Sequence, residues 1–169
     1  EKAFELSEAS NTPVIMQLRI RACHVQGRFT AKDNVKPRIN TIDRQREPAP
    51  FKYERLAHPP VTFVQEKLKV DQRLPAAQTY ILDNNINEFF DGDIERLGII
   101  VPGGLYNTLI RGLVRFGLAD DFGNSQIPIM VLNVIHPLVP EQFTDFCAGK
   151  DAVLVVDGDL LLQLNWLSH

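Results

Sequence analysis

The chain has 169 residues, of which 44% are hydrophobic and 23% charged, and its formal net charge is −3. This size suits one ordinary domain with an attached segment, and the near-neutral balance gives no overall attraction to nucleic acid or to an anionic membrane. The two cysteines, Cys23 and Cys147, lie far apart and do not support a disulfide framework, an iron–sulfur cluster or a zinc site within this chain. No apolar run reaches the length of a membrane span, and the amino end lacks a signal peptide's apolar run, so we expect a cytoplasmic protein.

The first 27 residues are predicted to form a helix and then a strand. A short apolar face precedes the breaker cluster Ser10-Asn11-Thr12-Pro13, and residues 14–23 change from continuously apolar to alternating. A helix and a strand cannot bury their apolar faces alone. We therefore interpret residues 1–27 as the closing unit of a domain that lies upstream.

Three cationic or titratable residues lie on or just after this predicted strand. Alternation places Arg19 and Arg21 on one side, with His24 opposite. The arginine pair can hold a carboxylate or a pyrophosphate, and His24 can shuttle a proton, but such residues more often form interdomain salt bridges. Nothing nearby supplies the second member of an acid–base pair.

Residues 28–94 are predicted to be an interdomain arm followed by a helix. Between Arg28 and Pro75 eleven Lys and Arg stand against six Asp and Glu, and prolines interrupt any sustained periodicity. The arm is expected to contain a short helix near residues 63–70. A second helix, with Ala76, Ala77, Tyr80 and Ile81 on one face, is expected to end near Asn84, before a loop through residues 91–93.

Residues 95–169 are predicted to be an α/β domain. Apolar strands at residues 97–101, 127–134 and 152–156 alternate with helices at 105–118 and 140–147. This spacing implies parallel strands joined by right-handed crossovers, and uninterrupted Val, Ile and Leu runs imply strands covered on both faces. The fold class is therefore a three-layer α/β/α sandwich with a mainly parallel sheet.

A glycine pair follows the first of these strands. Backbone N–H groups around Gly103 and Gly104, at a helix start, can hold an anion such as phosphate. The stretch is neither a dinucleotide-binding nor a Walker motif, and two glycines also permit a tight turn and close packing. His58, His136 and Cys147 lack the spacing of metal ligands or of a nucleophile with its base, and Cys147 is predicted to be packed on the apolar side of its helix.

Several stretches resemble the alpha-type chain of indolepyruvate ferredoxin oxidoreductases. The longest runs from Ile127 to Glu141 and continues through Phe146-Cys147-Ala148-Gly149-Lys150 to Val156; others are Gly103–Leu109, Arg19–His24 and Arg73–Ala77. They occur in order from about residue 3 to 156. After Val156 the family's acidic pair and Gly-Gln-Pro stretch are replaced by a leucine-rich end, where we expect a partner chain to cover the sheet edge.

The resemblance implies an enzyme that decarboxylates an aryl 2-oxoacid with thiamine diphosphate, Mg²⁺ and iron–sulfur clusters, forms an acyl-CoA and reduces ferredoxin. It further implies that residues 1–27 end the pyrimidine-binding domain, and that residues 95–157 form the domain that resembles the C-terminal domain of transketolase. Catalytic and cofactor residues would then lie outside this chain, which is expected to be inactive alone, with other domains or subunits and a second copy as partners.

Two other functions are compatible with the residues alone. A free-standing module could bind a nucleotide or coenzyme A at the Gly103–Gly104 turn, and the basic arm could bind nucleic acid. We expect neither nucleic-acid nor membrane binding, because the arm lacks interleaved aromatic residues and no apolar span is present.

Overall fold

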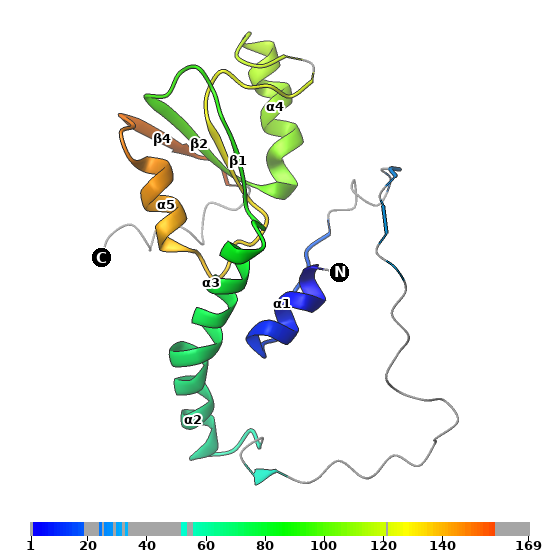
Figure 1. Ribbon diagram of the computed structural model, residues 1–169, viewed down its shortest axis with the longest axis vertical. Coiled ribbons are helices and arrows are strands. Elements are labelled where there is room, and N and C mark those ends of the chain that lie inside the picture. Colours follow the sequence, from blue (N-terminus) through cyan, green and yellow to red (C-terminus); the bar gives the residue numbers. More distant parts are fainter. Residues whose placement is uncertain are drawn as a thin grey trace.

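The computed structural model describes residues 2–18, 56–120 and 122–157, together with residues 24, 26–28, 30–31, 33 and 52–53. Predictions for Arg19, Arg21, most of the arm and the leucine-rich tail lie outside these residues. Within them the chain has two parts, a four-stranded sheet between helices and a long helix that leads into it (Figure 1). In the described residues, no helix combines the length and apolar character needed to cross a bilayer.

The sheet confirms the predicted mainly parallel α/β domain. Its strands are β1 (Glu88–Phe90), β2 (Leu97–Pro102), β3 (Ile129–Leu132) and β4 (Ala152–Val155), in the order β1-β3-β2-β4. Strand β2 pairs in parallel with β3 and β4, whereas β1 pairs with β3 in the antiparallel direction. The sequence reading missed β1, because three residues are too few to show an alternating pattern.

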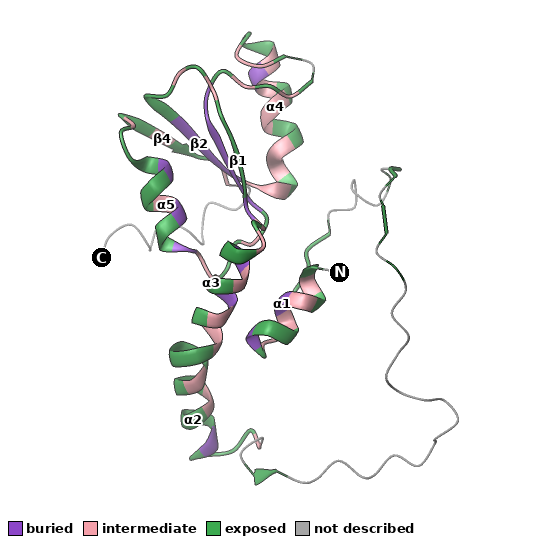
Figure 2. Cartoon of the chain, in the orientation of Figure 1, coloured by how far each residue is buried: buried purple, intermediate pink, exposed green. Residues whose placement is uncertain are grey.

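One helix covers each face of the sheet, which gives the predicted three layers (Figure 1). On one face Ile99 and Val101 pack with Leu113 of α4 (Tyr106–Arg115). On the other, Ile100 and Met130 pack with Phe146 of α5 (Pro140–Cys147). Successive residues of β2 thus enter opposite cores, and Figure 2 shows the central strands as the most buried part of the chain.

Helix α4 is followed by a glycine that ends it. Gly117 has a φ of 69°, in the left-handed region that residues with a Cβ avoid. The Gly117 N–H donates to Val114 O at 3.0 Å, and the Leu118 N–H donates to Leu113 O at 2.9 Å. These are the two bonds of a Schellman cap, so the helix stops here and the chain turns toward β3.

The helix that leads into the sheet is longer than predicted. It comprises α2 (Val61–Leu68), the π-helical segment η3 (Lys69–Arg73) and α3 (Leu74–Asp83) without a break. Pro75 was expected to separate two helices, because proline lacks an N–H and its ring crowds the preceding turn. The wider π turn directly before Pro75 accommodates the ring, so the rod continues.

The helix predicted at the amino end is confirmed as α1 (Lys2–Ser10). It lies along α3 (Figure 1). Leu6 packs with Ala77 and Ile81. Polar contacts flank this apolar seam. The Tyr80 hydroxyl donates to Glu5 Oε2 at 2.7 Å, and Lys2 Nζ donates to Asn84 Oδ1 at 2.9 Å.

The strand predicted for residues 14–23 is wrong in its described part. Residues 14–18 pair with no strand, and their apolar side chains are exposed: Ile15 is 91% exposed, Met16 63% and Leu18 68%. A strand needs a neighbour to satisfy its backbone N–H and C=O groups. Residues 14–18 have the apolar pattern of a strand, but they pair with none of the described strands.

The α1–α3 seam should weaken at high pH. Partial burial, the hydrogen bond to Glu5 and that carboxylate's charge raise the pKa of Tyr80 to about 12, from an ordinary value of 10.0. The folded protein therefore retains this proton more firmly than the unfolded chain, and Tyr80 should contribute stability below pH 10 that is lost between pH 10 and 12. Urea unfolding followed by circular dichroism should show that a Tyr80→Phe variant loses less stability between pH 10 and 12 than the unsubstituted protein does.

Tyr53, which is 54% exposed, provides the matched control. Tyr53→Phe should leave the pH dependence of stability as it is in the unsubstituted protein, because it leaves the α1–α3 contact intact. Identical pH slopes for the unsubstituted protein and Tyr80→Phe would show that the phenol does not hold α1.

Candidate functional site

In parallel α/β sheets a ligand usually binds beyond the carboxyl ends of the strands. Here β2 and β3 both end toward the loops that carry Gly103 and Asn133. The segment between α3 and β1 brings Asn87 to the same place, although it is distant in sequence. This strand-end region is therefore the candidate site.

A buried amide dominates the region. Asn87 is only 3% exposed, and its Oδ1 accepts hydrogen bonds from the backbone N–H groups of Asn133, at 2.9 Å, and Val134, at 3.1 Å. Its Nδ2 donates to Gln142 Oε1 of α5 at 2.8 Å. One side chain thus joins the end of β3, the first turn of α5 and the segment before β1.

Asn133 closes the remaining space. Its Nδ2 donates to Ile86 O at 2.8 Å and to Glu88 Oε2 at 3.2 Å. Its Oδ1 lies 2.5 Å from the position that a Cβ on Gly103 would occupy. The side chains of Asn87 and Asn133 are therefore bonded to neighbouring segments of the chain, although Asn133 itself is exposed to solvent.

The predicted glycine turn forms the 3₁₀ segment η4 (Gly103–Leu105), followed directly by α4. Gly103 allows the chain to pass close to Asn133, which is a packing role. Tyr106 then stacks on Phe90, with ring centroids 5.4 Å apart. Burial, and secondarily the Glu88 carboxylate, raise the pKa of Tyr106.

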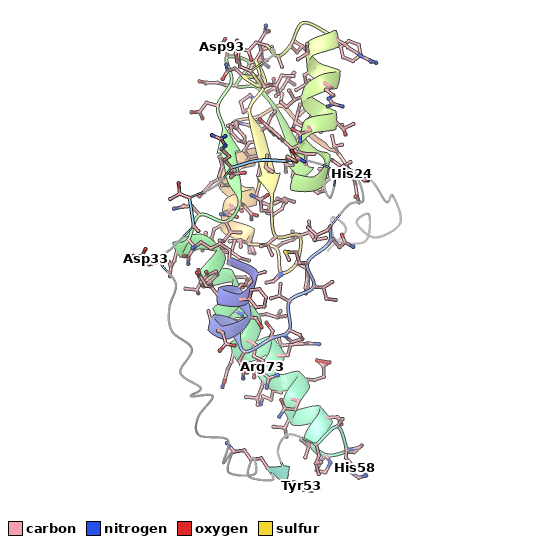
Figure 3. The ribbon with its side chains drawn as sticks, turned by 90° about the vertical axis from the view of Figure 1, so that its right-hand side faces the viewer. His24, Asp33, Tyr53, His58, Arg73 and Asp93 are labelled. Atoms are coloured by element: carbon pink, nitrogen blue, oxygen red, sulfur yellow. The ribbon has the colours of Figure 1, made fainter. Side chains whose placement is uncertain are left out.

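The other sequence-predicted residues are either not described or exposed. Arg19 and Arg21 lie outside the described residues, and His24 is exposed (Figure 3). His58 and His136 are also exposed, and the His58 Nδ1 lies 2.6 Å from Pro59 O. Anion binding by the arginines or by the glycine turn remains a prediction.

Cys147 corrects one interpretation. It was predicted to be packed on the apolar side of α5, but it is a free thiol exposed to solvent. Phe146, one residue earlier, occupies the buried position instead. Because α5 ends at Cys147, the side chain lies past the sheet-facing stripe of the helix.

A shallow depression of about 290 Å³ lies at the opposite end of the sheet from this region, lined by residues that include Asp93, Asp120 and Asn124. Asp120 is committed to its own loop, since its carboxylate accepts from the N–H of Phe122 and from both nitrogens of Asn124, at 2.7 to 2.9 Å. The Asn124 hydrogen bonds, with those of the loop N–H groups, lower the pKa of Asp120. The carboxylate fixes a turn.

Across the described part of the chain, no three His, Cys, Asp or Glu side chains converge to hold a metal ion.

Two curated proteins are similar to this chain over 92% of its length. The indolepyruvate oxidoreductase subunit IorA of Methanothermobacter marburgensis is 30% identical over 159 residues, and the subunit of the same name from Methanothermobacter thermautotrophicus is 25% identical over 160 residues. The family resemblance is thereby confirmed. This chain spans only 23% of the length of either relative, so it matches a piece of such a subunit.

Two other comparisons gave no match. No family model matches the chain, and no solved structure matches it. The assignment to the indolepyruvate oxidoreductase family therefore rests on the two IorA relatives and on the motifs from Arg19 to Val156.

The sequence reading missed the residues that matter most at the strand ends, Asn87, Asn133 and Gln142. Their role is only weakly indicated by the sequence. Asn133 interrupts an apolar strand, and Asn87 lies among other asparagines before an unpredicted strand. Only the fold shows that these amides meet.

A Cβ at Gly103 should destabilise the domain. Gly103→Ala would crowd Asn133 Oδ1, whose side chain is held by two further hydrogen bonds, and should cost about 1–3 kcal/mol in free energy of unfolding. Gly112 in α4 has open space around it, so Gly112→Ala should stabilise by roughly 0.5–1 kcal/mol. Urea unfolding measures both, and equal effects of the two substitutions would contradict the packing role.

Loss of the Asn87 amide should cost more. Asn87→Ala leaves two backbone N–H groups and the Gln142 side chain without their partner, for an expected loss of about 2–4 kcal/mol. Asn107 is exposed on α4, and Asn107→Ala should change stability by less than about 0.5 kcal/mol. Chemical denaturation that finds both variants equally stable would show that the amide does not join these segments.

Proposed function

We propose that this chain is a packing and assembly element of an indolepyruvate oxidoreductase subunit, and that other parts of the enzyme carry the chemistry. The observation that supports this most directly is how the polar groups at the strand ends are bonded. Asn87 bonds Gln142 and the backbone N–H of Asn133 where α/β enzymes usually hold a ligand, and the Asn133 side chain bonds the segment before β1. Those residues serve to fasten segments together.

The surface of the chain supports an assembly role. Large apolar side chains are exposed on several elements, among them Phe4 on α1, Ile15 in the following segment and Phe63 on α2, each at least 74% exposed. Edge strand β4 adds Leu154, which is 59% exposed. These exposed apolar side chains are available for contacts with further polypeptide, as the proposed role requires.

For the whole enzyme we propose the reaction implied by the sequence resemblance. An aryl 2-oxoacid is oxidatively decarboxylated to an acyl-CoA, and the electrons pass to ferredoxin. Thiamine diphosphate, Mg²⁺ and iron–sulfur clusters would be bound by parts of the enzyme other than the described residues. In this proposal the chain contributes the interfaces that hold those parts in place.

The isolated 169-residue chain should be inactive. With indolepyruvate, coenzyme A, thiamine diphosphate and Mg²⁺ supplied, reduction of a viologen dye should not exceed the rate without protein. Calorimetric titration with thiamine diphosphate and Mg²⁺ should show no saturable binding, because the described residues offer no converging ligands. Indolepyruvate-dependent dye reduction by this chain would overturn the proposal.

The alternative is a free-standing module that binds a nucleotide or coenzyme A at Gly103 and Gly104. Titration with ADP and with coenzyme A separates the two functions. We expect no heat of binding for either ligand. Micromolar binding that is lost in a Gly104→Val variant would favour the alternative.

A further inference from the structure

The helical segment from Val61 to Arg73 has one buried or half-buried face and one exposed face. Val61, Gln65 and Leu68 are buried or half-buried, at helical spacing. Arg73 Nη2 donates to Gln65 Oε1 at 2.6 Å along the same side. In Figure 1, α2 lies at the end of the molecule farthest from the sheet, whereas α1 lies beside α3.

The opposite face is exposed and apolar at both ends. Phe63 is 74% exposed and Val70 60% exposed, and the two residues are about two turns apart. Exposed Glu66 and Lys67 lie between them on the same side. Figure 2 shows α2 as mostly exposed. This set, Phe63, Glu66, Lys67 and Val70, is called the outer face below.

We propose that the outer face is an interface with a second copy of this chain, formed by two antiparallel helices. The pattern of the outer face is complementary to itself. With a two-fold axis between positions 66 and 67, Phe63 of one copy meets Val70 of the other, and Glu66 meets Lys67 in both directions. An isologous contact requires this symmetry, in which each residue finds its complement on the same patch.

The charge pattern is the reason for choosing a second copy as the occupant. The symmetric pairing places two opposite-charge pairs at the centre and apolar pairs on either side. Shifting the axis onto Lys67 would place like charges opposite each other, so the charges also fix the register. The interface is independent of the proposed enzymatic reaction.

The helix pair is small, which sets the expected strength. Thirteen residues from Val61 to Arg73 span about 20 Å. A contact of this length buries less than a standard interface, so the dimer should be reversible and concentration-dependent. Salt should weaken it, because its central pairs remain near solvent.

Sedimentation velocity of the full 169-residue chain, from low micromolar to several hundred micromolar at low salt, tests the interface. Phe63→Ser should raise the dimer dissociation constant about tenfold or more. Phe116, which is 79% exposed on the α/β domain, provides the control, and Phe116→Ser should leave the constant unchanged. A monomer at every concentration, or an equal effect of both serine variants, overturns the proposal.

Charge reversal tests the pairing itself. Glu66→Lys and Lys67→Glu should each weaken the dimer, because each places two like-charge pairs at the axis, whereas the double variant should restore it. Glu66 also pairs with Lys69 within its own helix, and the double variant does not restore that pair. Rescue by the double variant therefore reports the contact between copies. Double and single variants that dimerise equally poorly, with helix content unchanged by circular dichroism, would exclude this pairing.

Discussion

The fold depends on one buried amide. Asn87 lies where the long helix ends and the sheet begins, and its three hydrogen bonds reach β3, the loop after it and α5. A buried polar side chain is costly unless it is satisfied, and Asn87 uses both its oxygen and its nitrogen. The helical lead-in and the sheet domain are therefore held at a fixed junction by specific bonds.

The same junction explains why α1 can dock. Val139, at the start of α5, belongs to the apolar cluster that contains Leu6, Ala77 and Ile81. Asn87 positions Gln142 of that helix, so it indirectly sets one wall of the α1 seam. Packing of α1 thus depends on a hydrogen bond between Asn87 and Gln142, both of which lie far from it in the sequence.

The sequence predicted what depends on local periodicity and missed what depends on tertiary contact. Strands β2, β3 and β4 and helices α4 and α5 follow from apolar period and from Pro140. Strand β1 exists only because β3 offers an edge to pair with, and the rod through Pro75 exists because a π turn makes room for the ring. Residues 14–18 show the converse, since a strand pattern without a partner forms no strand.

The sequence predicted where the candidate site lies but not which side chains form it. The Gly103–Gly104 turn marks the strand ends correctly, because glycines there permit close approach of chain segments. The group that lies close to Gly103 is the side chain of Asn133, and no local sequence pattern links these two residues. With the strand ends occupied by the protein's own amides, the open surfaces are the apolar ones on the helices and on β4. These surfaces are the reason for the proposal that this part of the chain serves contacts between polypeptides.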